Sequence, residues 1–198
     1  GMFHAVNGDG PKASCQNDPE TFVGMRSAQF DAWNEETCAS YLDDLNAAIA
    51  ENRNLDTEKY IHMMRNTEPL GYEKFKEQLH FPDAEGMEYV EKITDKMINQ
   101  TVEMFSKYPY VSGCGRPVYS YEDFGGTTSI ETYQKGELMT YSTKTLKLLW
   151  EHIEKCEAEG IHLAKEILAN GVRHYGYKGL DDAEAAMKEY VESLPIEM

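Results

Sequence analysis

Cationic residues are scarce in this chain. Its 198 residues include 19 Lys and Arg against 35 Asp and Glu, which gives a net charge of −16. A charge of this size and sign repels the phosphates of nucleic acids and the anionic headgroups of membranes over long range. The sequence therefore predicts neither a nucleic-acid partner nor attachment to an anionic membrane.

Long apolar runs are missing as well. Although 41% of the residues are hydrophobic, no run approaches the roughly 18 apolar residues that a membrane span requires. The chain does not open with the charged, apolar and small-residue regions of a secretory leader, and Gly1 before Met2 resembles the remnant of a cleaved tag. We therefore expect a cytoplasmic protein in which residues 2–198 form a single domain.

Cysteine is sparse and widely spaced. The four cysteines are Cys15, Cys38, Cys114 and Cys156, and no two of them form a Cys-x-x-Cys pair. This spacing is typical of reduced thiols in a chain large enough to fold without disulfides. It argues against a zinc ribbon and against a redox dithiol.

Strand patterns are also absent, because no segment alternates convincingly between apolar and polar residues. Apolar residues instead recur at helical spacing, and caps precede several of these stretches. Two capping boxes are expected, at Thr128-x-x-Glu131 and Asp181-x-x-Glu184. The sequence predicts an all-α domain of about eight helices, with stretches at about 19–32, 34–51, 56 onward, 70–80, 83–107, 129–141, 143–158, 161–172 and 182–193.

The two halves of the chain share a pattern when one is shifted by 108 positions. Asn34 then aligns with Ser142, and Leu45 aligns with Ile153. We therefore expect pseudo-repeats at 18–66 and 129–175, packed about a pseudo-twofold axis. The alternative is that any two amphipathic helical hairpins would align this well.

Residues 109–128 interrupt the helical pattern with four glycines and two prolines. We expect a long loop, and long loops inside compact domains are often functional. Its glycines let backbone amides approach a ligand, its arginine offers a planar donor fork, and Thr127–Ser129 lead into a helix N-terminus that favours anions. The candidate ligand-binding residues in this loop and the following helix are Gly115, Arg116, Thr127, Thr128, Ser129, Glu131, Tyr133 and Glu137.

Two kinds of enzyme remain as alternatives. Cys15 lies close to a predicted helix start, where the pKa of a thiol falls, and His174 is a candidate partner for it. The pairs Glu77-x-x-His80 and Glu159-x-x-His162 have the spacing of di-iron ligands on one helix face. An acidic chain produces such pairs by chance, and an ordinary thiol is commoner than a catalytic one, so these residues are weak candidates.

A different class is a helical interaction module without a ligand. In that case the 109–129 loop is a packed connector, and an apolar face meets a protein partner or a second copy of the chain.

The motifs taken together resemble a bacterial family known as domain of unknown function 4125. The residues that carry the resemblance are Ala13–Gln16, Asp18, Phe30, Trp33, Arg53–Leu55, Glu58–Tyr60, Gly115–Pro117, Glu131–Tyr133, Gly136–Leu138, Thr140–Ser142 and Tyr175–Tyr177. The family has no assigned reaction, so the resemblance implies no catalytic roles. It implies a helical module, in some relatives joined to a nucleotidyltransferase-like domain, which makes a nucleotide-using protein an expected partner.

The chain departs from the family pattern in two places. Relatives tend to begin with a further helix upstream of Met2, so we expect this chain to be truncated at its N-terminus. Gly160–Leu163 differs from the Gly-Arg-Asn-Leu expected there, which weakens the case for a symmetric pair of sites.

We predict that the protein binds a small anionic or nucleotide-like ligand through its 109–129 loop.

Overall fold

The chain is all-α. A computed structural model describes residues 19–113, 115–124 and 127–194, and these contain no strand beyond an isolated bridge between Phe124 and Thr127. The helices are α1 (Pro19–Phe30), α2 (Glu35–Ala50), α3 (Leu55–Thr67), α4 (Pro69–Phe75), η3 (Lys76–Gln78), α5 (Ala84–Lys107), α6 (Pro109–Gly113), η4 (Ser120–Glu122), α7 (Ile130–Leu138), α8 (Thr143–Ala158), α9 (Leu163–His174) and α10 (Leu180–Ser193). The described residues contain ten α-helices, of which nine match the expected stretches and the tenth, α6, lies in the segment expected to be a loop.

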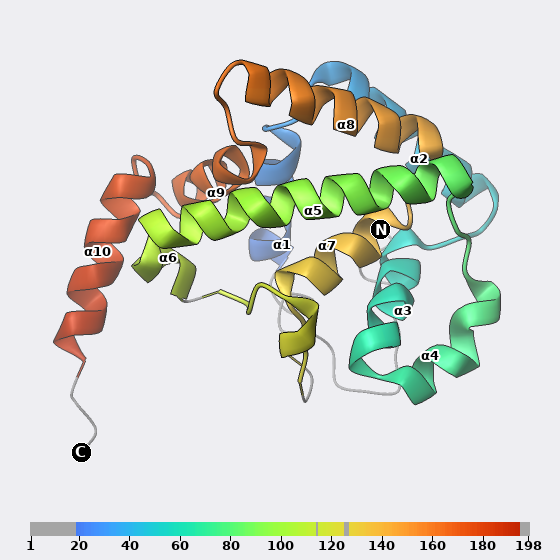
Figure 1. The fold of residues 1–198 in the computed structure, drawn as a ribbon, viewed down its shortest axis with the longest axis horizontal. Helices are drawn as coiled ribbons and strands as arrows, with labels where there is room; N and C mark the ends of the chain where they lie inside the picture. The colour runs from blue at the N-terminus through green and yellow to red at the C-terminus, as the bar shows by residue number, and fades with distance from the viewer. Residues whose placement is uncertain (1–18, 114, 125–126, 195–198) are drawn as a thin grey trace.

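The long helix α5 runs through the middle of the molecule, with α8 along one side of it and α7 along the other (Figure 1). Its buried residues recur at helical spacing and include Val90, Ile93 and Met97. These residues join Leu146, Ile153 and other buried side chains in the main hydrophobic core. A smaller hydrophobic core lies near the C-terminal end of α5, where α10 packs on α6 and α9.

The first three helices pair crosswise with three helices of the second half. Helix α1 packs on α9, α2 on α8, and α3 on α7. A two-fold arrangement of two three-helix units produces this pairing, and it brings α1, α3 and α7 around one point. The duplication itself stays a prediction.

Equivalent turns in the two halves also have equivalent geometry. The side chains of Asn34 and Ser142 cap α2 and α8, each accepting from the amide three residues on. In both helices the residue that follows the C-cap has a positive φ. This residue is Asn52 after α2, with φ of 55°, and Gly160 after α8, with φ of 75°. Such a left-handed residue is a common helix ending, and it favours glycine or asparagine.

Several expected helix starts are wrong. Helix α7 is capped by Ser129, whose hydroxyl accepts from Thr132 N, so the expected cap at Thr128 is displaced by one residue. Helix α3 starts after Asn54. The expected box at 181–184 does not form, because α10 begins at Leu180 and the carboxylate of Glu184 accepts from the first amides of α6 instead.

The expected loop at 109–128 is partly helical, since it contains α6 and η4. Pro109 favours a helical start because its ring fixes φ and its missing N–H is not needed in the first turn. Within the described residues, no helix is long and apolar enough to cross a membrane.

Candidate functional site

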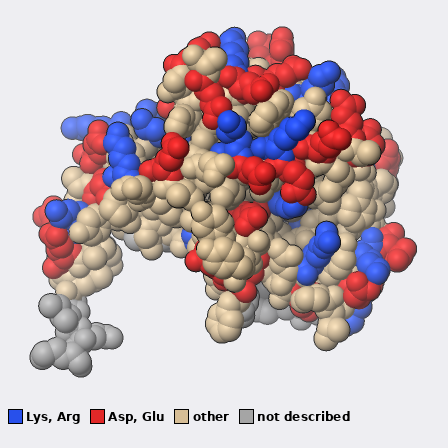
Figure 2. Space-filling view, viewed as in Figure 1, with Lys and Arg blue, Asp and Glu red and all other residues tan. Residues whose placement is uncertain are grey.

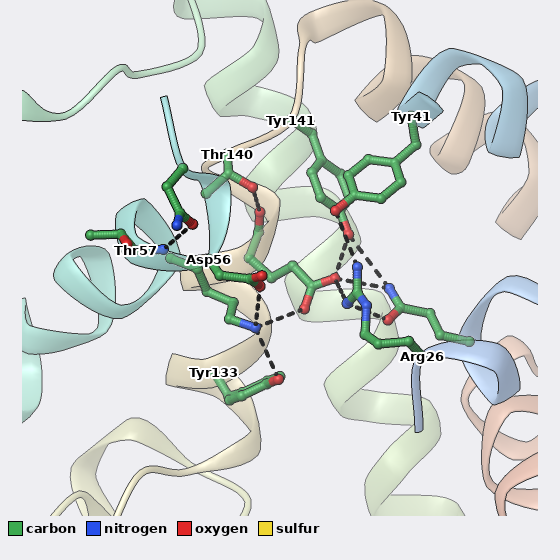
Figure 3. A network of polar contacts seen from close by, with 11 residues as sticks. Arg26, Tyr41, Asp56, Thr57, Tyr133, Thr140 and Tyr141 are labelled. Atoms are coloured by element: carbon green, nitrogen blue, oxygen red, sulfur yellow. Dashed lines mark hydrogen bonds and ion pairs between the residues drawn. The ribbon is translucent and has the colours of Figure 1, made fainter. Parts of the chain in front are cut away.

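A buried polar network lies where α1, α3 and α7 meet (Figure 3). Its central group is the carboxylate of Glu137 on α7, a residue that is only 7% exposed. Glu137 Oε1 accepts from Tyr141 OH at 2.5 Å, from Gln29 Nε2 at 3.2 Å, and from Arg26 Nη1. Three donors converge on one oxygen, so the carboxylate is held in a fixed orientation.

Two cations balance the acids of this network. Arg26 on α1 bonds to Glu137 and donates from Nη2 to Tyr41 OH at 3.1 Å. Lys59 on α3 lies with its Nζ 4.0 Å from Glu137 Oε2 and 3.6 Å from Asp56 Oδ1. The network thus contains two positive and two negative charges, as a buried ionic cluster needs if it is not to destabilise the fold.

Burial and charge act in opposite directions on these groups. Burial by itself raises the pKa of Glu137, but the charges of Arg26 and Lys59 and the hydrogen bonds from Tyr141 and Arg26 outweigh it, so the pKa falls to about 2. Burial also lowers the pKa of Lys59, yet Glu137 and its neighbours raise it above the ordinary value. Burial raises the pKa of Tyr41 to about 12.

These shifts fix the protonation states at neutral pH. Glu137 stays ionised, Lys59 stays charged and Tyr41 stays neutral, so none of them exchanges a proton as a general acid or base near pH 7 would. The network therefore holds helices together and positions the residues around it. Among those is Tyr133, whose hydroxyl accepts from Lys59 Nζ at 3.1 Å.

A pocket of about 470 Å³ lies on the segment that joins α6 to α7. Its walls come from the end of α5, from α6 and from residues 115–122. Its volume lies within the usual range for small-molecule sites. Figure 2 shows this part of the surface as a largely uncharged projection at the lower centre of the view.

One polar side chain in the pocket wall, Arg116, is available to a ligand. Ser112 also lines the pocket, but its hydroxyl oxygen is buried and has no hydrogen-bond partner among the described residues. Arg116 is exposed, donates from Nη1 to the carbonyl of Thr128 at 3.1 Å, and lies 5.3 Å from the ring centroid of Tyr133. No carboxylate of the described residues forms an ion pair with Arg116, so its guanidinium retains unused donors.

Tyr133 connects the pocket to the buried network. Its hydroxyl accepts from Lys59 Nζ, which lies 4.8 Å from its ring centroid, and the Arg116 guanidinium lies 5.3 Å from the same centroid. Cation–π stacking and the buried hydrogen bond together restrict where Arg116 can lie. The network therefore positions the cation of the pocket through one aromatic side chain.

The rim of the pocket is aromatic. Tyr119 and Tyr121 are stacked, with ring centroids 5.3 Å apart and planes 13° from parallel. Tyr121 is nevertheless 81% exposed, so one face of its ring is covered by Tyr119 and the other faces solvent.

The expected anion site at the N-terminus of α7 already contains an acid of the protein itself. The carboxylate of Asp123 accepts from Ser129 N and from Thr132 Oγ1, both at 2.6 Å. The next two amides, of Ile130 and Glu131, donate to main-chain carbonyls. This corrects the interpretation of Thr127, Thr128 and Ser129, because the helix start they lead into has no free N–H for a ligand.

The other predicted ligand residues have mixed positions. Gly115 and Arg116 line the pocket, and Tyr133 lies behind Arg116. Glu131 accepts from Ser120 N at 2.7 Å and thereby holds the pocket segment against α7. Glu137 is buried in the network, out of reach of a ligand in the pocket.

The residues behind the enzyme alternatives are not brought together. Cys15 lies outside the described residues, and His174 faces Asp31 at 3.9 Å. His80 faces Glu58, and His162 faces Glu103. Within the described ranges, no group of three or more His, Cys, Asp or Glu is arranged to hold a metal ion, so Glu77 and Glu159 do not meet in one di-iron site.

Sequence reasoning missed Arg26, Lys59 and Ser112 as site residues. Arg26 and Lys59 read as ordinary charges on amphipathic helices, and nothing in their spacing reveals a distant partner. A signal did exist for Lys59, because it stands in one of the motifs that carry the family resemblance, as do Tyr133, Glu137 and Tyr141.

Comparison with known families agrees with that resemblance. The model of the family described as "Protein of unknown function (DUF4125)" matches residues 1–185. The chain belongs to the DUF4125 family. No curated protein and no solved structure matches this DUF4125 chain. The family motifs around Lys59, Tyr133, Glu137 and Tyr141 meet in its buried network. The motif Gly115–Pro117 lines the pocket.

Proposed function

We propose that this protein binds a small anionic ligand in the pocket on the segment that joins α6 to α7, with Arg116 as the charged contact. The observation that carries the proposal is the Arg116 guanidinium, which lines the pocket and forms no ion pair with a carboxylate of the described residues.

The surroundings of Arg116 support an anion over a neutral ligand. Its guanidinium is held by Thr128 and Tyr133 and bears no carboxylate partner. A positioned guanidinium in a chain of net charge −16 is a local positive site in a negative field, and its planar donors suit phosphate or carboxylate.

The test is a titration of ¹⁵N-labelled protein with inorganic phosphate and with ribose 5-phosphate, followed by NMR. We expect shifts confined to the amides of Gly113, Gly115 and Arg116. Arg116→Ala should weaken binding by about tenfold or more, as expected for the loss of a charged hydrogen bond. Arg116→Lys should recover part of it, because charge is kept and the planar fork is lost.

The matched control is Arg173→Ala, which removes an exposed arginine on α9 whose side-chain partner among the described residues is the neighbouring Asn170. It should bind as the unchanged protein does. Equal binding by the Arg116→Ala variant, or shifts that spread over the whole surface, would refute the proposal.

Three finer statements belong to the same proposal. We infer that the ligand is used together with a nucleotide-dependent partner of the nucleotidyltransferase type, as the family resemblance implies, and that the protein acts in the bacterial cytoplasm. Its ligand is either a simple anion or nucleotide-like.

The exposed aromatic tip favours a second candidate function, a helical interaction module. Tyr121 and Phe124 are 81% and 83% exposed, and such side chains are enriched in protein interfaces. A mass that rises with protein concentration, and that Phe124→Ser returns to the monomer, would support this function in place of ligand binding.

A further inference from the structure

The pocket has two features that the binding of a simple anion does not require. One is the open ring face of Tyr121, and the other is a carboxylate, Glu122, in the same wall. Both bear on which kind of anion the pocket accepts, and both extend the function proposed above.

Tyr121 is oriented before any ligand arrives. Tyr119 covers one face of its ring in a near-parallel stack, and the two residues lie at the start of η4, a turn closed by the bond from Tyr119 N to Glu122 Oε2 at 2.8 Å. A ring fixed in this way loses little conformational freedom when a second ring stacks on its open face.

An exposed aromatic side chain that merely fills space would not need this arrangement. Leaving 81% of a tyrosine exposed beside a pocket forgoes the apolar burial that usually stabilises such side chains. A flat ligand would cover the open face and extend the stack by one ring.

The charge of the pocket limits the charge of the ligand. Among its lining residues Arg116 is the one cation and Glu122 the one anion. One guanidinium can bind a single phosphate or carboxylate group through two parallel hydrogen bonds. A triphosphate would bring further negative charge toward Glu122 in a chain that is already strongly acidic, so Coulomb repulsion disfavours it.

We propose that the pocket binds a ligand of the nucleoside monophosphate class, one flat ring system joined to one anionic group, with the open face of Tyr121 as its stacking platform. This inference rests on the proposed function, because the anionic group is the one that Arg116 receives. Stacking is tolerant of ring identity, so purine rings should bind more tightly than pyrimidines through their larger area.

The experiment compares AMP, ribose 5-phosphate and ATP without added metal, each titrated calorimetrically into the full chain. We expect AMP to bind more tightly than ribose 5-phosphate by about 5- to 150-fold, the range that base–aromatic stacking confers. ATP should bind more weakly than AMP. The Glu122→Gln variant should show a smaller difference between its affinities for AMP and ATP than the unchanged protein.

Variants at Tyr121 separate stacking from folding. Tyr121→Ala should reduce the affinity for AMP to that for ribose 5-phosphate and leave the latter unchanged, whereas Tyr121→Phe should keep the affinity for AMP. The control is Tyr190→Ala, which removes another exposed tyrosine, on α10, and should bind all three compounds normally.

The outcomes distinguish the two proposals. If ribose 5-phosphate binds as tightly as AMP in an Arg116-dependent way, the stacking inference fails and the anion site stands. The same holds if Tyr121→Ala binds AMP normally. If none of the three compounds binds, both proposals are overturned.

Discussion

At the scale of single residues, the most consequential contact is the one between Glu137 and its two cations. Arg26 and Lys59 come from helices that are far apart in the sequence from α7. Removing the negative charge leaves Lys59 with Asp56 as its ion-pair partner and leaves Arg26 with the neutral partners Gln29 and Tyr41 among the described residues. Breaking a buried ionic group in this way is far more costly than losing an exposed pair.

Glu137→Gln is therefore expected to lower the free energy of unfolding at pH 7 by about 3 kcal/mol, because the cations lose their counter-charge while the shape is kept. Urea unfolding followed by circular dichroism measures this change. The control Glu91→Gln removes an exposed partner of Lys135 and should have little effect. A Glu137→Gln variant as stable as the control would contradict a central role for the network.

The effect of Glu137→Gln on the free energy of unfolding should depend on pH. The folded-state pKa of Glu137 is about 2, against an ordinary value of 4.5, so the stabilisation from its charge is complete above about pH 4.5 and is lost as the pH falls toward 2. The stability difference between the native chain and Glu137→Gln should therefore shrink over that window. A difference that stays constant between pH 5 and pH 2.5 would show that charge is not its cause.

At the scale of helices, the contact of α3 with α7 depends on a glycine. A Cβ atom built on Gly136 would lie 2.8 Å from Met63 Cγ and 3.1 Å from the carbonyl oxygen of Lys59. The absent side chain lets the two helices approach closely enough for Lys59 and Glu137 to interact. Gly171 on α9 is different, because a Cβ there would meet nothing closer than Ala28 Cβ at 4.0 Å.

The same substitution should thus have opposite effects at the two glycines. Gly136→Ala is expected to destabilise the protein by about 1–3 kcal/mol, as overpacking does. Gly171→Ala is expected to stabilise the protein by up to about 1 kcal/mol, because alanine has a higher helix propensity than glycine. Thermal unfolding of both variants measures the sign directly, and a shift in the same direction for both would disprove the close approach.

The helix starts show which N-caps can be predicted from neighbouring residues alone. Asp83, Asn34 and Ser142 cap helices where the sequence predicts them, since an N-cap acts within three residues of itself. The predicted boxes at Thr128 and Asp181 fail because Glu131 and Glu184 bond to other segments of the chain. Local rules cannot detect an acid that has a better donor elsewhere.

At the scale of the whole molecule, the two halves do not have separate cores. Helices α1, α2 and α3 pack on α9, α8 and α7, and α5 packs on α7, α8 and α9. Residues of both halves, such as Trp33 and Tyr141, are in one hydrophobic cluster. Neither half buries its apolar face without the other.

We therefore expect the chain to unfold in one cooperative transition. Helix content followed by circular dichroism and the fluorescence of Trp33 and Trp150 should give the same urea midpoint. Residues 19–108 and 109–194, produced as separate chains, should each lack a cooperative transition. Two resolved midpoints, or a half that folds alone, would show that the halves are independent domains.

The sequence by itself determined the features that depend on near neighbours and on total composition. Helical spacing fixed the all-α class and most helix positions, and the motifs fixed the family. The segment of the pocket, including Gly115 and Arg116, followed from its break in helical pattern.

The tertiary structure alone decided which charged side chains pair and which polar groups have no partner. Arg26 joins Glu137 across 111 positions, the carboxylate of Asp123 occupies the N-terminus of α7, and the Arg116 guanidinium has no carboxylate partner among the described residues. Side-chain contacts at such separations depend on helix packing, and spacing along one helix carries no information about them.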